Sequence, residues 1–150
     1  DKVNGLLLKL VLVNTPLLRL LPKTFMKKSG DSVSALASFY KLREEQILIV
    51  HDEIELPFGW VSIKKGGGTA GHGGLRSVQS SLGTAGFLRL QIGVSRPSRG
   101  NVASYVLSRF SPEEETRLQD VFSCAEQLLS EAFASRFEEP FLPVKRSCIL

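Results

Sequence analysis

The sequence has 150 residues, of which 43% are hydrophobic and 23% charged, proportions close to the average of folded globular proteins. This length suits one domain with its own hydrophobic core and is short for two. No apolar run is long enough to cross a bilayer, because the longest, Gly5–Val13, is interrupted by Lys9. Composition therefore excludes disordered, fibrous and membrane-spanning proteins. The net charge of +4 and the pI near 9.3 permit a phosphate-bearing partner without requiring one.

The first third of the chain predicts a hairpin and a helix. Gly5–Val13 is rich in Leu and Val and is typical of a strand, and Leu17–Leu21 is the expected partner strand after a turn at Asn14–Pro16. Ser29–Ser32 offers N-cap residues for a helix that runs to about Lys41. Its apolar residues recur at helical spacing: Val33, Leu36, Ala37 and Tyr40.

The middle of the chain alternates strands with a glycine-rich loop and a helix. Ile47–Val50 is a continuous apolar run, which predicts a strand buried on both faces. Trp60–Ile63 is a second expected strand. After the loop Gly66–Gly74, we expect a helix from about Gly74 to Leu82 that ends at Gly83.

The last third predicts one strand and a long helix. Leu88–Val94 alternates apolar with polar residues, which indicates a strand with one wet face. Val102–Phe110 leads toward a helix that starts with a Ser111 cap and Pro112 at its first position. Its apolar stripe comprises Leu118, Val121, Phe122, Ala125, Leu128, Leu129, Ala132 and Phe133. This order of strands and helices predicts an α/β sandwich in a single domain spanning residues 1–150.

The two cysteines, Cys124 and Cys148, are too few for a disulfide framework. Cys124 lies on the apolar face of the long predicted helix, so we expect it to be a buried thiol. This cysteine usage favours a reducing compartment: the cytoplasm, or a mitochondrion or plastid if the source is eukaryotic.

A His51-Asp52-Glu53 cluster follows the strand predicted at Ile47–Val50, where open α/β sheets place their ligands. An Asp in this position can orient a catalytic imidazole. A metal site is the competing functional interpretation, but it requires three or more convergent ligands, and neighbouring strand residues face apart. Charges that merely end a strand at the surface are the third alternative.

The segment Lys64–Gly74 contains six of the 13 glycines. Glycines let a backbone approach a ligand closely, and a helix start beyond them can bind phosphate. The segment is not a Walker A loop, because its lysines precede the glycines, and it lacks the dinucleotide-binding fingerprint. A flexible loop without a special role is the alternative. His72 has glycine on both sides and is not expected in the core.

Two further stretches contain candidate binding residues. Pro22–Gly30 joins a strand end to a helix start, and its Phe25 and Met26 either line a pocket or belong to the core. In the stretch Arg89–Pro97, the polar side of the predicted strand either contributes cations near the glycine segment Lys64–Gly74 or is simply exposed to solvent.

Taken together, the motifs resemble the bacterial-type peptidyl-tRNA hydrolases. Five segments match the family in order and spacing: Pro22–Val33, Ile47–Gly59, Ile63–Val78, Leu88–Pro97 and Tyr105–Glu114. The resemblance implies a mixed, twisted sheet flanked by helices in a three-layer sandwich. It also implies hydrolysis of the ester between a peptide and the 3′ end of tRNA, which recycles tRNA for translation. Neither a metal nor an organic cofactor is implied; the partner is peptidyl-tRNA rather than a membrane, and the protein is a monomer.

The resemblance also implies roles for individual residues. Asp52 corresponds to the carboxylate that orients and polarises the catalytic His. Phe25 and Met26 correspond to the lining of the cleft that holds the peptide and the terminal nucleotide. Lys64 corresponds to a cation that meets the tRNA 5′ phosphate. The remaining implied substrate-binding residues are Lys27 beside the cleft and Gly71, His72 and Gly73 in the glycine wall.

The chain departs from the family at several of these positions. The family has Asn in place of Lys27 and of Gly73, and both amides lie around the scissile ester and the attacking water. Its second phosphate-binding cation, usually Arg, is Gln91 here. The family's sequences open with a strand, an Asn-Pro-Gly turn and a helix with the catalytic His. None of these precedes Asp1 here. We therefore expect the first strand and helix to be missing from the sandwich and hydrolysis to be impaired.

Two other functions stay open beside the hydrolase. One is a catalytically silent relative that binds tRNA or other RNA, which the charge of Lys27 favours. The other is an enzyme for a different ester or phosphoester, in which Asp52 acts directly on water.

Overall fold

The computed structural model describes residues 20, 28–135 and 141–149. The chain divides into two compact units, each of which is described by itself. The first contains residues 1–14, 50–64 and 89–150, and the second contains residues 15–49 and 65–88. The predicted hairpin strands at Gly5–Val13 and Leu17–Leu21 lie outside the described residues, apart from Leu20. Within the described ranges, no helix has the length and apolar character needed to cross a membrane.

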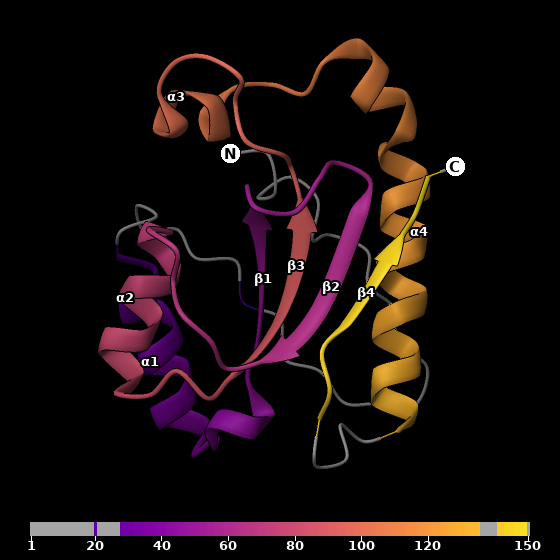
Figure 1. The fold of residues 1–150 in the computed structure, drawn as a ribbon. Helices are drawn as coiled ribbons and strands as arrows, with labels where there is room; N and C mark the ends of the chain where they lie inside the picture. Colours follow the sequence, from indigo (N-terminus) through magenta and orange to yellow (C-terminus); the bar gives the residue numbers. More distant parts are fainter. Residues whose placement is uncertain (1–19, 21–27, 136–140, 150) are drawn as a thin grey trace. The chain divides into compact units, whose positions relative to one another are not determined.

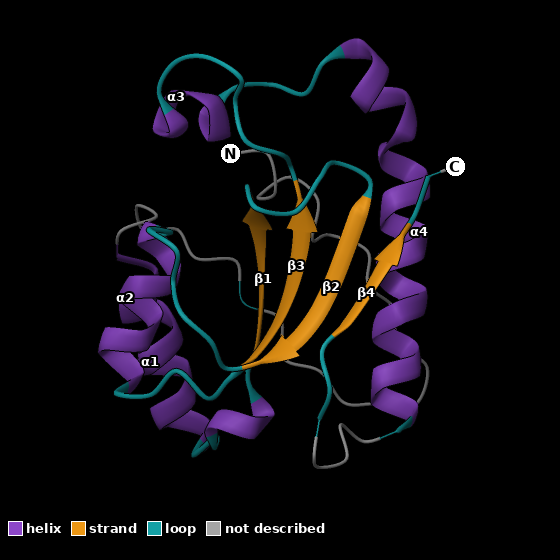
Figure 2. Cartoon of the chain, in the orientation of Figure 1, coloured by secondary structure: helices purple, strands orange, loops and turns teal. Residues whose placement is uncertain are grey.

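In the described part of the chain, four strands form one mixed sheet in the order β1-β3-β2-β4 (Figures 1 and 2). The strands are β1 (Leu48–Glu53), β2 (Trp60–Lys65), β3 (Leu88–Gly93) and β4 (Val144–Ser147). β1 and β3 are parallel, because Leu88 N donates to Ile47 O (2.9 Å) and Val94 N to Glu53 O (3.0 Å) with the same offset. β2 and β4 are antiparallel. The predicted α/β class with a mixed sheet is confirmed.

Two strand predictions need correction. β1 extends to Glu53, and its buried residues are His51 and Asp52, whereas its apolar residues are only half-buried. β3 has no wet face, since all six of its residues are buried. β3 lies between β1 and β2, and its polar side chains Arg89 and Gln91 are buried on one face of the sheet. Alternation along one strand cannot reveal this burial.

The first unit contains α3 (Val102–Leu107) and α4 (Pro112–Ala134). α4 starts as predicted: Ser111 Oγ accepts from Glu114 N (3.1 Å), and the Glu114 carboxylate accepts from Ser111 N (2.9 Å). α3 is tied to the end of β3, because the Tyr105 hydroxyl donates to Val94 O. The predicted stripe on α4 is buried at Val121, Ala125, Leu128, Leu129 and Ala132. The sheet of this unit contributes the buried apolar residues Val61, Ile63, Leu90, Ile92 and Val94.

The prediction of a free Cys124 thiol is wrong, because Cys124 on α4 forms a disulfide with Cys148 after β4. The pattern places Cys124 on the apolar face of the helix, and in the structure this residue is half-buried. The pattern could not show that the following strand returns along the same helix and brings Cys148 within a Cα–Cα distance of 5.5 Å, which is suitable for a disulfide.

The second unit contains α1 (Ser29–Tyr40), the short 3-10 helix η3 (Glu44–Gln46) and α2 (Gly73–Leu82). α1 begins at Ser29 with Lys28 as its N-cap residue and no side-chain cap, so the predicted cap within Ser29–Ser32 is wrong. The N–H of Gly30 instead donates to Ser77 Oγ of α2 (2.9 Å). A Cβ on Gly30 would lie 2.1 Å from Ser77 O, so glycine is required for this approach.

α2 ends at Gly83 as predicted, and Gly83 has a φ of 72°. The core of the second unit gathers around Phe87, which is fully buried. Its other buried residues come from α1, α2 and the start of β1: Ala37, Ile47, Leu75 and Val78. Val33, Leu42, Ile49 and Leu82 pack against this cluster.

Candidate functional site

The last three residues of β1 are the polar cluster His51, Asp52 and Glu53. His51 and Asp52 are 4% and 7% exposed, and as neighbours in a strand they face opposite sides of the sheet. His51 Nδ1 lies 2.8 Å from the backbone oxygen of Asp52. A carbonyl oxygen only accepts, so Nδ1 carries the ring proton of this bond. The partner of His51 Nδ1 is thus the backbone oxygen of Asp52 rather than its carboxylate.

Glu53 is held by the neighbouring strand β3. Gln91 Nε2 donates to Glu53 Oε1 (3.2 Å). On the same face of β3, Arg89 is completely buried; burial lowers the pKa of its guanidinium, and the negative charge of Glu53 opposes that shift. Glu53 thus accepts a hydrogen bond from Gln91 and provides a negative charge near Arg89. Gln91, which the resemblance matches to a phosphate-binding cation, is engaged in the interior.

The turn that follows β1 is fixed against β3. Phe58 N donates to Ser95 Oγ (2.8 Å), and a Cβ on Gly93 would lie 2.1 Å from Pro57 O. The Phe58 ring also meets Phe110, with 5.8 Å between ring centroids. The backbone directly after Asp52 and Glu53 is therefore closely packed, which favours a fixed position for the Asp52 carboxylate.

Lys64 lies on β2 and is half-buried. Two residues earlier on the same face is Ser62, which lies directly opposite Lys145 of β4. Residues opposite each other in an antiparallel pair share a face, so Lys64 and Lys145 place two cations on one side of this strand pair. Ser62 between them is small and 1% exposed. The pair forms a local positive surface that suits a phosphate group.

The glycine segment lies in the second unit and leads into α2. Gly66 and Gly67 have φ angles of 69° and 107°, conformations that favour glycine. His72 is the N-cap of α2, and its Nδ1 accepts a hydrogen bond from Leu75 N (3.1 Å). His72 is half-buried, Gly71 is exposed and Gly73 is the first residue of the helix. His72 thus positions the helix start, a role that its spacing before Leu75 could have indicated.

Replacing His72 by Ala removes this cap, so we expect a loss of about 1 kcal/mol in the free energy of unfolding. His72→Asn supplies another side-chain acceptor and should retain most of the stability. Denaturant unfolding of the two variants measures the difference. A loss in His72→Asn as large as in His72→Ala would contradict the capping role.

A surface hollow of about 470 Å³ lies beside the C-terminal half of α2. Its lining is mostly polar: Thr69, Arg76, Gln79, Ser80, Gly83, Thr84 and Ala85. Thr69 belongs to the glycine segment, and its carbonyl accepts from His72 N (2.8 Å). The segment and α2 therefore share a polar surface that includes the cation of Arg76.

The structure covers only part of the predicted site. Phe25, Met26 and Lys27 lie outside the described residues. Asp52 and Lys64 belong to the first unit, and Gly71, His72 and Gly73 to the second. The sequence did not reveal the contacts of Glu53 with Gln91 and Arg89, because these depend on which strands are neighbours.

Comparisons with known proteins agree with these motifs. The family model described as peptidyl-tRNA hydrolase matches residues 1–146. A peptidyl-tRNA hydrolase of Neisseria meningitidis (strain FAM18) is 43% identical over 119 residues, which are 79% of this chain and 62% of that protein. The peptidyl-tRNA hydrolase of Geotalea uraniireducens (strain Rf4) is 51% identical over 98 residues, 65% of this chain and 51% of that protein.

Solved structures give the same result. The crystal structure of the peptidyl-tRNA hydrolase from Acinetobacter baumannii has 32% sequence identity and a TM-score of 0.64, and the match covers 77% of this chain and 60% of that one. The chain thus spans about three fifths of the length of the relatives from Neisseria and Acinetobacter. With the family model covering nearly the whole sequence, the chain belongs to the peptidyl-tRNA hydrolase family.

Proposed function

We propose that the protein hydrolyses the ester bond between peptide and tRNA in peptidyl-tRNA and so returns tRNA to translation. Membership of the family supports this reaction, and the observation that carries it is Asp52, a buried carboxylate at the end of β1. In this proposal Asp52 orients and polarises a catalytic imidazole, which acts as general base toward water. His51 is not that imidazole, because the two neighbouring side chains face opposite sides of the strand.

The substrate-binding part of the proposal assigns a role to each predicted residue. Phe25, Met26 and Lys27 line the cleft for the peptide and the terminal nucleotide, and Gly71, His72 and Gly73 form a further wall. Lys64 contacts a tRNA phosphate, a contact that the nearby charge of Lys145 favours. Because Lys27 and Gly73 stand where the family has asparagine, we expect slower hydrolysis than in relatives that have both amides. We further propose a single-domain, cytoplasmic monomer that needs no metal or cofactor.

Neutralising Lys64 tests the tRNA contact. Lys64→Gln should weaken tRNA binding and reduce the slope of log K against log salt concentration by about 1, because one phosphate contact is lost. Lys41→Gln removes the same charge at the C-cap of α1 and serves as the control. Fluorescence anisotropy over a KCl series measures both slopes. Equal slopes in the two variants would contradict a phosphate contact at Lys64.

A catalytically silent, RNA-binding relative is the second candidate function. The features that favour it are the positive charge of Lys27 and the lack of a side-chain amide at Gly73, where the family has asparagine, together with the cations Lys64 and Lys145 on one face. Salt-dependent binding of tRNA without release of peptide would support this candidate. Release of peptide from peptidyl-tRNA by this chain, once it is joined to an N-terminal segment that carries a catalytic His, would support the hydrolase.

A further inference from the structure

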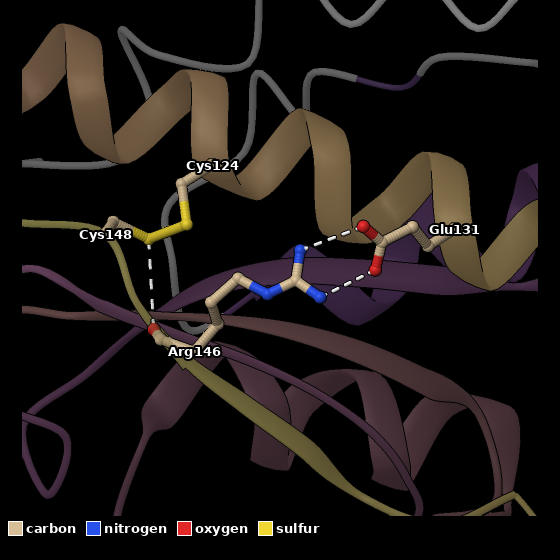
Figure 3. A network of polar contacts seen from close by, with 4 residues as sticks. All are labelled: Cys124, Glu131, Arg146 and Cys148. Carbon is tan, nitrogen blue, oxygen red and sulfur yellow. Dashed lines mark hydrogen bonds and ion pairs between the residues drawn. A yellow bond between two sulfur atoms is a disulfide. The ribbon is translucent and has the colours of Figure 1, made fainter.

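One disulfide and one ion pair join α4 to the C-terminal strand β4 and the residue after it (Figure 3). The disulfide connects Cys124 with Cys148, which are 24 positions apart in the sequence. About two helical turns further along α4, the Glu131 carboxylate accepts two hydrogen bonds from the Arg146 guanidinium, at 3.1 and 2.6 Å. The charge and hydrogen bonds of Arg146 hold the pKa of Glu131 below its usual value. The ion pair is exposed, so the disulfide is the stronger of the two links.

Apart from these two links, β4 is attached to the described sheet through its pairing with β2. It comprises only Val144–Ser147 and, in the described sheet, pairs with β2 alone. Three of its four residues are exposed. A short edge strand that buries little surface belongs to the least stable parts of a fold. Its attachment therefore depends strongly on the disulfide at its end.

The residues after β4 touch the turn that follows the candidate site. Cys148 N donates to Gly59 O (2.7 Å). The Ile149 side chain packs on Gly59 so closely that a Cβ there would lie 2.4 Å from Ile149 Cδ1. Gly59 ends the turn that starts after Glu53. The disulfide thus holds a tail that packs against the backbone segment following Asp52.

We propose that Cys124–Cys148 is a redox modification site, whose reaction partner is a dithiol reductant and whose state controls the attachment of β4. Both cysteines are half-buried, so a thiolate can reach a sulfur atom. The thiolate bonds to one sulfur, and the other leaves as a thiolate. The second thiol of the reductant then displaces the first protein sulfur. The reductant becomes a disulfide, and the protein gains two electrons and two protons as two thiols.

Reduction should loosen β4 and lower the stability of the chain. Opening a loop of about this size raises the equilibrium constant for unfolding by roughly a few hundredfold in the chain-entropy description. For a chain of this length, we expect the melting temperature to fall by about 7–14 °C. Amide hydrogen exchange of Val144–Ile149 should become faster, while that of β3 should change little, since β3 lies inside the sheet.

The test compares the full chain after treatment with oxidised glutathione and after treatment with dithiothreitol. Thiol titration should find no reactive thiol in the first state and two in the second, and only the second state should exchange rapidly at Val144–Ile149. Cys124→Ser should resemble the reduced protein and should not respond to dithiothreitol. Glu131→Gln breaks the ion pair but leaves both cysteines in place, so it should still respond.

Two results would overturn the proposal. One is two free thiols after treatment with oxidised glutathione. The other is unchanged exchange at Val144–Ile149 on reduction of the unmodified chain, a comparison that needs no variant to fold. Neither readout involves peptidyl-tRNA, so the redox proposal and the proposed hydrolase function can fail independently.

Discussion

In this chain joined to an N-terminal segment that carries a catalytic His, Asp52→Asn should reduce the rate of peptide release from peptidyl-tRNA by about 10²- to 10⁴-fold, with little change in KM. Asn has nearly the same shape as Asp, but it has lost the negative charge that stabilises an imidazolium during proton transfer. General-base assistance contributes factors of this size. The effect should fall on kcat because the carboxylate is buried in β1 and, in the proposed mechanism, contacts the base rather than the substrate.

The control for this prediction is Glu55→Gln, which makes the same chemical change three residues later. Glu55 is exposed and forms an ion pair with Arg96, away from the proposed reacting groups. Its variant should keep the kcat of the unmodified protein. Steady-state assays on the same peptidyl-tRNA measure kcat and KM of both variants, and circular dichroism verifies that both are folded. Unchanged turnover in folded Asp52→Asn would show that the role assigned to Asp52 is wrong.

Phe87→Ala should lower the free energy of unfolding by about 3–5 kcal/mol. Phe87 is completely buried at the centre of the second unit, and truncation there loses apolar burial and leaves a cavity. Its backbone oxygen also accepts from Gly66 N (3.0 Å), at the start of the glycine segment. The variant should therefore weaken the support of this segment as well as the core.

Phe39→Ala is the matched control, since the same side chain is 76% exposed on α1. Its truncation should change the free energy of unfolding by no more than about 0.5 kcal/mol. Urea denaturation followed by circular dichroism measures both variants. If Phe87→Ala were no more destabilising than Phe39→Ala, the proposed core of the second unit would be refuted.

Features that depend on neighbouring residues could be predicted from the sequence. The Ser111 cap of α4 and the end of α2 at Gly83 both arise within one helical turn. The strand around Trp60–Ile63 also appeared where its pattern indicated. Local chemistry fixes these elements, so a single sequence was enough to find them.

Features that depend on distant residues could not be predicted. Arg89 and Gln91 look like a solvated face in the sequence, but strands on both sides and the charge of Glu53 make their burial possible. The start of α1 bonds to Ser77 of α2 rather than to a cap of its own. The disulfide likewise depends on how β4 returns along α4. In each case the sequence does not show which distant residue lies beside the one in question in the folded chain.

The sequence proposes the residues of the candidate site, but it shows few of their contacts. The motif around Asp52 and the glycine segment were both recognised as more than packing. The capping role of His72 needs the helix start at Gly73, and the pairing of Ser62 with Lys145 needs the register between β2 and β4. The location of the site therefore stays a prediction from the pattern of residues, and tertiary structure supplies the hydrogen bonds of those residues that it describes.

The central claim is that this chain contributes the Asp52 carboxylate to peptidyl-tRNA hydrolysis. Its most direct test is the initial rate of peptide release from a peptidyl-tRNA of defined sequence by this chain joined to an N-terminal segment that carries a catalytic His, measured with Asp52 intact and with Asp52→Asn. The account predicts release that falls by about 10²-fold or more in the variant. Salt-dependent binding of the same tRNA, with no release by either protein, would contradict it.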